Sequence, residues 1–213
     1  MKNIQLKVCG MKHNPIEVAA LQPDYVGFIF YEGSPRNFEG SLSTLPPEVK
    51  KVGVFVNASI SEIVNKVKQF QLDVIQLHGD ETASFCKELA VSEEINTEIW
   101  KVFGIKDTFD FSVLKEFEPY VSAFLFDTKG KEKGGNGYAF NWNILKEYTS
   151  EIPFVLSGGI GLNEIEPLSE ILKTDLPVFA IDVNSKFEDK PGLKNTNQLQ
   201  QFMDKLNTIQ SNL

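Results

Sequence analysis

The sequence predicts an α/β fold, a single-domain (β/α)8 TIM barrel that spans residues 1–213. Eight short apolar runs follow one another along the chain, and their first residues are 21 to 31 positions apart. Amphipathic segments with helical spacing lie between most of these runs. Eight strand and helix units favour a closed barrel over a doubly wound open sheet, which usually has about five or six strands.

The apolar runs are rich in β-branched and aromatic residues and are continuous rather than alternating. Strands that are buried on both faces, as in a parallel sheet covered by helices, have this pattern. Each unit needs its neighbours to bury both faces, so we expect no internal domain boundary. The predicted strands are Ile4–Val8, Tyr25–Phe30, Val52–Val56, Val74–Leu77, Ile99–Phe103, Ala123–Phe126, Phe154–Leu156 and Val178–Ile181.

The clearest helix signal is a capping box from Ser59 to Glu62, followed by apolar residues every three or four positions as far as Phe70. Residues Phe38 to Lys50 contain two consecutive prolines and predict only a short or weak helix. The long connection from Lys129 to Gly137 is charged and then glycine-rich, which indicates a mobile lid. Further predicted helical stretches are Ile16–Leu21, Thr82–Ala90, Phe109–Phe117, Trp142–Tyr148, Leu162–Leu172 and Gln198–Leu206.

Composition excludes several classes of protein. A content of 42% hydrophobic and 23% charged residues is typical of a folded globular chain. The net charge is −8 and the basic residues are dispersed, which argues against nucleic acid as a partner. No stretch approaches the ~18 apolar residues of a membrane span, and the N-terminus lacks the features of a secretory signal. Cys9 and Cys86 form neither a disulfide framework nor a zinc set, so we expect a reducing, cytoplasmic location.

Active sites of such barrels lie at the C-terminal ends of the strands. Cys9 and Asp127 directly follow the first and sixth predicted strands and form a candidate acid and base pair. A neighbouring cation can lower a thiol pKa enough to make a base, although free cysteines are often simply buried hydrophobic residues. Burial can raise the pKa of a carboxyl such as Asp127 so that it holds a proton, although an aspartate here could equally cap the next turn.

Two glycine or polar turns predict an anion site. Ser157-Gly158-Gly159-Ile160 follows the seventh strand and Asp182-Val183-Asn184-Ser185 the eighth, where these barrels often bind phosphate through backbone N–H groups. Arg36 in the second loop could grip a carboxylate through two hydrogen bonds, or lie solvated. His78 is interpreted as a residue that lines the site, because no second ligand for a metal accompanies it.

Taken together, these segments occur in order over nearly the whole chain: Lys7-Val8-Cys9-Gly10-Met11-Lys12, Gly27-Phe28-Ile29-Phe30 with Ser34-Pro35-Arg36, Val52-Gly53-Val54-Phe55-Val56, Gln76-Leu77-His78-Gly79, Phe126-Asp127 with Gly134-Gly135-Asn136-Gly137-Tyr138-Ala139-Phe140-Asn141-Trp142, Ser157-Gly158-Gly159-Ile160 and Asp182-Val183-Asn184-Ser185. The ordered set resembles the phosphoribosylanthranilate isomerases of tryptophan biosynthesis. The sequence departs from that family's usual pattern at three positions: Asn141 and Asn195 stand where the family usually has aspartate, and Lys186 stands where a glycine is common.

The resemblance implies an Amadori rearrangement of N-(5-phosphoribosyl)anthranilate, a small phosphorylated substrate, without cofactor or metal. It implies that Asp127 is the general acid that opens the ribose ring and that the Cys9 thiolate is the general base. Arg36 would hold the anthranilate carboxylate. The phosphate would be surrounded, mostly through backbone N–H groups, by Gly158, Gly159, Asp182, Asn184 and Ser185.

Two alternatives remain open from the sequence. The first is another phosphosugar isomerase or lyase on the same barrel, since a fold and a phosphate site do not select a reaction. The second is a barrel that binds a phosphorylated metabolite without catalysis, which the presence of both Cys9 and Asp127 disfavours. The sequence leaves monomer and homodimer equally open.

Overall fold

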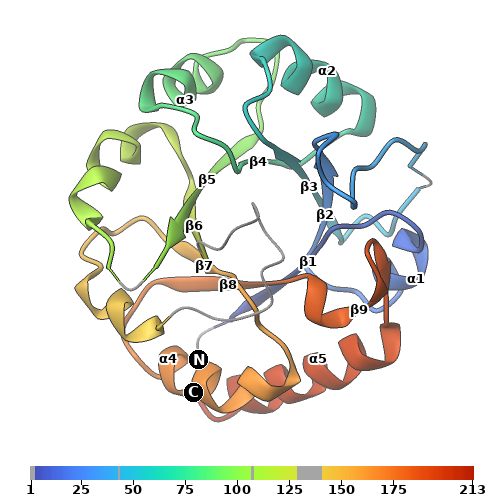
Figure 1. Cartoon of the computed structure of the whole chain (residues 1–213), viewed down its shortest axis with the longest axis vertical. Helices are drawn as coiled ribbons and strands as arrows, with labels where there is room; N and C mark the ends of the chain where they lie inside the picture. The colour runs from blue at the N-terminus through green and yellow to red at the C-terminus, as the bar shows by residue number, and fades with distance from the viewer. Residues whose placement is uncertain (1–2, 43, 107, 129–140) are drawn as a thin grey trace.

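The computed structural model describes residues 3–42, 44–106, 108–128 and 141–213. Within them, eight parallel strands pair in chain order and close into a barrel, which confirms the predicted fold (Figure 1). The last strand pairs with the first, with Leu6 opposite Ile181. The strands are β1 (Gln5–Cys9), β2 (Tyr25–Phe30), β3 (Lys50–Phe55), β4 (Val74–Leu77), β5 (Glu98–Ile105), β6 (Ala123–Thr128), β7 (Phe154–Leu156) and β8 (Val178–Val183).

Helices form an outer ring around the strands (Figure 1). The predicted cap at Ser59 is present, because its side chain accepts a hydrogen bond of 3.2 Å from the Glu62 N–H. None of the helices in the described ranges is long and apolar enough to cross a membrane. The α-helices are α1 (Pro15–Ala19), α2 (Ile60–Phe70), α3 (Ala83–Ala90), α4 (Ile165–Leu172) and α5 (Thr196–Gln210), and the 3-10 helices are η1 (Phe111–Glu116), η2 (Glu118–Tyr120), η3 (Trp142–Glu147), η4 (Leu162–Glu164) and η5 (Ser185–Phe187).

Some local expectations differ from the structure. No helix forms in the described parts of residues 38–50, and the chain turns at Pro47 and Glu48 instead. Each proline lacks a backbone N–H, and Pro47 disfavours helical geometry at the residue before it. The helices expected over Phe109–Phe117 and Trp142–Tyr148 are the short 3-10 segments η1 and η3. The expected lid falls within residues 129–140, outside the described residues.

A small antiparallel hairpin follows β8, which the sequence did not predict. It consists of β9 (Glu188–Lys190) and β10 (Leu193–Lys194). Gly192, between the two strands, has a φ of 80°, a left-handed conformation that glycine adopts at little cost. The hairpin brings Glu188 and Lys194 to the C-terminal end of the barrel.

Two of the departures from the family pattern are helix caps. Asn141 precedes η3 and accepts a hydrogen bond of 3.1 Å from the Asn143 N–H. Asn195 precedes α5 and accepts one of 3.0 Å from the Gln198 N–H. Asparagine and aspartate are about equally good at this position, so both departures preserve the local structure.

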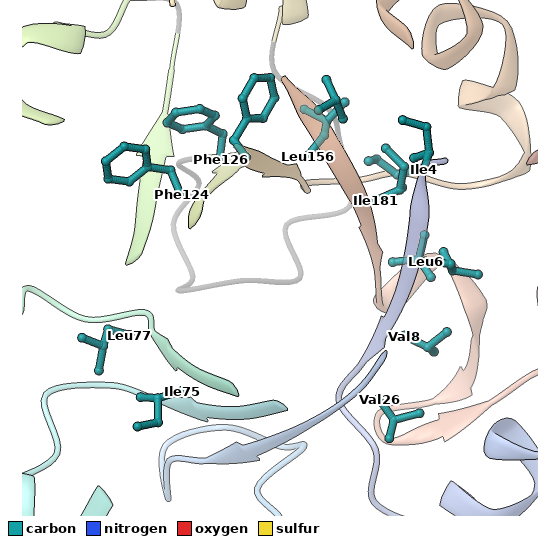
Figure 2. Close-up of a cluster of buried hydrophobic side chains, with 14 of the residues drawn as sticks. Ile4, Leu6, Val8, Val26, Ile75, Leu77, Phe124, Phe126, Leu156 and Ile181 are labelled. Carbon is teal, nitrogen blue, oxygen red and sulfur yellow. The ribbon is translucent and has the colours of Figure 1, made fainter. Parts of the chain in front are cut away.

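The hydrophobic core has two parts, because successive side chains of a strand point to opposite faces. One part lies between the strands and the helices, and Figure 2 shows its side chains, among them Leu6, Val8 and Phe126, pointing away from the barrel axis. The other fills the barrel interior and includes Tyr25 and Trp100, whose rings lie 5.1 Å apart. On β1, Lys7 and Cys9 therefore point into the interior.

A buried ion pair fixes the turn after β4. Lys101 Nζ on β5 donates to Glu81 Oε2 at 2.9 Å, and both side chains are almost fully buried. The other oxygen of Glu81 accepts from the backbone N–H of Asn57 at 2.8 Å. Gly79 N–H also donates to this carboxylate at 2.9 Å. The loops after β3 and β4 are thereby joined to β5, and the turn that carries His78 is held in place.

Candidate active site

A cavity lies at the C-terminal ends of the strands and contains about 720 Å³ of empty space, part of it open to solvent. The structure brings together every site residue that the sequence predicts, although they come from six different strands or the loops after them. The predicted residues that line the cavity are Cys9, Arg36, His78, Asp127, Gly158, Gly159, Asp182, Asn184 and Ser185.

Asp127 lies near the end of β6 and is 7% exposed. Its Oδ1 accepts a hydrogen bond of 2.8 Å from the Thr128 N–H, and its Oδ2 lies 3.5 Å from His78 Nε2. Burial, together with the negative charge of Asp182, raises the pKa of Asp127 to about 7. A substantial fraction of this carboxyl therefore carries a proton at neutral pH, as a general acid requires.

Gly158 is required by the close approach of β6. Its φ is 91°, and a Cβ there would lie 3.0 Å from Asp127 Oδ1 and closer still to Thr128. The turn after β7 therefore packs against the candidate acid through a glycine that no other residue could replace without strain. The Gly-Gly turn is needed here for close packing as well as for any anion binding.

Cys9 ends β1 and is buried. Burial raises the pKa of its thiol above the ordinary value of 9.0, while the positive charges of Lys7 and Lys194 act in the opposite direction. A neighbouring cation can lower a thiol pKa, and two cations are present here, but the desolvation of a buried thiolate outweighs them. The thiol form of Cys9 therefore predominates at neutral pH.

Lys7 and Asp182 form an ion pair inside the barrel. Lys7 Nζ donates to Asp182 Oδ1 at 3.0 Å, and Lys7 is 0% exposed. The Ser157 hydroxyl donates to the other carboxylate oxygen, Asp182 Oδ2, at 3.5 Å. The side chain of Asp182 is thus directed at Lys7, so any contact between this residue and a phosphate would come from its backbone.

Arg36 is already paired. Its Nε and Nη2 donate to the two oxygens of Glu188, with distances of 2.9 Å from Nε to Oε1 and 2.7 Å from Nη2 to Oε2. Lys194 Nζ also donates to Glu188 Oε1, at 2.7 Å, and to Asn184 Oδ1 at the same distance. The sequence predicts that Arg36 binds a ligand carboxylate through two hydrogen bonds. In the structure, Nε and Nη2 of Arg36 make such a bidentate contact with Glu188 instead.

The loops after β7 and β8 meet beside the cavity. Gly159 has a φ of 65°, and a Cβ on Gly161 would lie 3.1 Å from Lys186 Cβ. Ser185 begins η5, and the side chain of Lys186 adds a positive charge to the cavity lining. The departure at Lys186 therefore places a cation next to the turns where the sequence predicts phosphate binding.

His78 lines the cavity, and Gln76 lies behind it on β4. Gln76 Nε2 is 3.4 Å from His78 Nδ1. If the amide donates to Nδ1, the proton of a neutral ring is on Nε2, which faces Asp127. Within the described residues, no group of three or more His, Cys, Asp or Glu side chains could hold a metal ion.

Four residues around the site were not predicted from the sequence. Lys7 and Gln76 lie two positions before Cys9 and His78, so strand alternation could have placed them on the same inward face. Glu188 and Lys194 carry no such signal, because they reach the site through the unexpected hairpin.

The barrel, and a thiol and a carboxyl that line one cavity with the turns after β7 and β8, define the class of protein: an enzyme with a TIM-barrel fold and a candidate site at the C-terminal ends of its strands. A family model described as N-(5′-phosphoribosyl)anthranilate (PRA) isomerase matches residues 6–205. The chain belongs to this family, whose members are isomerases.

Individual proteins of this family are similar to the chain in sequence and in structure. The N-(5′-phosphoribosyl)anthranilate isomerase of Parabacteroides distasonis is 41% identical over 94% of this chain and 92% of the relative. The crystal structure of phosphoribosyl anthranilate isomerase from Thermotoga maritima has a TM-score of 0.81 and 28% identity, covering 96% of this chain and 99% of that chain. Another solved structure of the isomerase, in complex with reduced 1-(o-carboxyphenylamino)-1-deoxyribulose 5-phosphate, has a TM-score of 0.78 and 26% identity, covering 96% and 99%.

Proposed function

We propose that this chain converts N-(5-phosphoribosyl)anthranilate to 1-(2-carboxyphenylamino)-1-deoxyribulose 5-phosphate, with Asp127 as general acid and Cys9 as general base. The observation that carries the proposal is that a carboxyl with a pKa of about 7 and a thiol beside two cations line the same cavity. Family membership supports the substrate, since the relatives are named for it.

In the first step, the Asp127 carboxyl gives its proton to the ring oxygen of the ribose. The bond between that oxygen and C1 breaks, and the nitrogen lone pair forms a C1=N double bond, which leaves a protonated imine. Asp127 is then a carboxylate. The Thr128 N–H donates to it at 2.8 Å, so the charge that forms is stabilised by an existing hydrogen bond.

In the second step, the Cys9 thiolate removes the proton on C2. The C–H electrons form a C1=C2 double bond, and the imine electrons return to nitrogen, giving an enolamine. This enolamine gains a proton at C1 and loses the hydroxyl proton at C2, which yields the ketone. Cys9 afterwards releases its proton to solvent and Asp127 takes one up, so both groups return to their starting states and the net reaction is an isomerisation.

The charged ends of the substrate would position its sugar between the two groups. The phosphate would bind at the turns after β7 and β8, through N–H groups of Gly159 and Ser185 and the side chain of Lys186. Glu188 occupies Nε and Nη2 of Arg36, so the anthranilate carboxylate would bind through Nη1. His78 would line the sugar site beside Asp127. Such positioning contributes several kcal/mol to catalysis.

The direct test is turnover of N-(5-phosphoribosyl)anthranilate by the purified wild-type chain in D2O. We expect the ketose product, identified by the NMR signal of its C2 carbonyl carbon, to carry solvent deuterium at C1. A control without enzyme measures any spontaneous rearrangement. Absence of enzyme-dependent product would refute the proposed function, and ketose formation without deuterium would refute proton removal by an exchangeable base.

A further inference from the structure

Lys7 has no part in the two chemical steps, yet it is a fully buried cation in the barrel interior. Its Nζ donates to Asp182 Oδ1 at 3.0 Å. Buried ion pairs are often no more stabilising than apolar residues of the same size, because both charges must leave water. The position of this pair therefore calls for a role other than stability.

The geometry places the Lys7 side chain against Cys9. The two residues are two positions apart on β1, so both point inward. Gly27 on β2 is paired with Cys9 in the sheet. A Cβ on Gly27 would lie 2.9 Å from Cys9 Sγ and 3.2 Å from Lys7 Cε. Both side chains thus pack over the same glycine, and the ammonium group and the sulfur are neighbours.

Three charged groups act on this sulfur, each from a different strand. Lys7 on β1 and Lys194 on β10 are positive and favour the thiolate. Asp182 on β8 is negative and disfavours the thiolate. Burial opposes ionisation in addition, so the buried sulfur depends on nearby positive charge if it is to act as a base.

We propose that Lys7 is a positioning residue of the reaction, whose ammonium group stabilises the Cys9 thiolate against burial while Asp182 fixes that ammonium group beside the sulfur. The assignment rests on the proposed function, since a thiolate is needed only if Cys9 removes a proton. When Cys9 accepts the proton from C2, its charge disappears, and Asp182 still neutralises Lys7. The ion pair therefore keeps the cation in place in both states of the base.

The test is titration of Cys9 in the free enzyme, followed by ultraviolet absorbance of the thiolate and by the rate of alkylation. A Cys86→Ala background leaves Cys9 as the sole thiol. In that background, Lys7→Met should raise the titration midpoint by about 1 pH unit or more, and Lys7→Arg should restore most of the effect. Asp182→Asn, which keeps an oxygen to accept from Lys7, should lower the midpoint.

Shifts of the Cys9 titration midpoint in opposite directions in Lys7→Met and Asp182→Asn would indicate an electrostatic role for Lys7. Disruption of packing alone would not change the direction of the shift between these two variants. An unchanged midpoint in Lys7→Met, or shifts of both variants in the same direction, would overturn the proposal. If Lys7→Met fails to fold, the titration midpoint of Asp182→Asn alone tests the proposal. An unchanged midpoint in that variant would also overturn the proposal.

Wild-type turnover distinguishes this inference from the proposed function. An enzyme that rearranges the substrate but shows no opposite shifts refutes the role of Lys7 alone. If the titration midpoints shift in opposite directions but the wild-type chain does not rearrange the substrate, the lack of turnover refutes the proposed function. The effect of Lys7 on Cys9 then cannot be assigned to this reaction.

Discussion

Arg36 and Glu188 form a two-pronged ion pair, with 2.7 Å between Nη2 and Oε2, although 152 positions separate them in the chain. Lys194 donates to the same carboxylate at 2.7 Å. Burial would raise the pKa of Glu188, but the hydrogen bonds from Arg36 and Lys194 hold it below its usual range. Glu188 is therefore an anion that fixes the orientation of the arginine at the cavity wall.

This relationship predicts that Arg36 acts mainly in binding. We expect Arg36→Ala to raise KM by roughly 10- to 100-fold with a smaller change in kcat, the loss typical of a hydrogen bond between charged groups. Glu188→Gln should raise KM less, because the arginine remains but is no longer fixed. Steady-state kinetics measure both variants, and an unchanged KM in Arg36→Ala would contradict the carboxylate contact.

Removal of the candidate acid should abolish most of the activity. Asp127→Asn keeps an oxygen that can accept from the Thr128 N–H, but an amide is too weak an acid to protonate the ring oxygen. We expect kcat to fall by ~10²-fold or more. Circular dichroism provides the control for folding. A variant as active as the wild type would exclude Asp127 from the acid step.

Serine in place of Cys9 should be equally damaging, because a hydroxyl does not ionise in the range in which a thiol does. We expect Cys9→Ser to lower kcat by ~10²-fold or more and to leave the unfolding temperature nearly unchanged. Cys86→Ser is the matched control, since Cys86 is also a buried thiol but lies on α3 away from the cavity lining. Similar losses in both variants would point to a structural effect.

The order of the two pKa values predicts the pH profile. The proposed mechanism needs Asp127 protonated and Cys9 ionised, although Asp127 has a pKa of about 7 and the pKa of Cys9 lies above its ordinary value of 9.0. The fraction in this form rises with pH up to about 7, then stays level until Cys9 is titrated. We expect kcat/KM to follow that course. In Asp127→Asn, the break near pH 7 should disappear from the residual activity.

The same carboxyl should cost stability at neutral and alkaline pH. Its pKa is about 7 in the folded state against an ordinary 3.8, so its favourable contribution is complete only at acid pH and is lost as the pH rises to about 7. Asp127→Asn should therefore be more stable than the wild type at pH ~8, by up to a few kcal/mol, with a smaller gain at pH ~4. Urea unfolding at the two pH values measures the difference, and a larger gain at acid pH would contradict the raised pKa.

The Lys101 and Glu81 pair predicts a structural weakness. Glu81→Gln leaves the ammonium group of Lys101 buried without its counter-ion, which should destabilise the fold by about 3 to 5 kcal/mol. The double variant Glu81→Gln with Lys101→Met should recover part of this loss, because no unpaired charge remains. Urea unfolding provides the test. A double variant that is no more stable than Glu81→Gln would show that the charge is not the cause.

The sequence was sufficient for the barrel because its evidence is local. Continuous apolar runs such as Val74–Leu77 mark buried strands, and the strands close in the order in which they occur. The same regularity placed Cys9 and Asp127 at one end of the barrel. Local evidence failed where the chain adopts short 3-10 segments or a small hairpin, since a few residues carry no periodicity.

The sequence thus determined which end of the barrel the predicted residues share, through their positions at the ends of strands or in the loops that follow, although it missed Gln76. Their partners and their states of charge were decided only by the tertiary structure. Lys7 meets Asp182, and Arg36 meets Glu188, across 175 and 152 positions of the chain. The pKa of a buried group depends on the water it has lost and on the charges that surround it in space, and neither of these is written in the residues next to it in sequence.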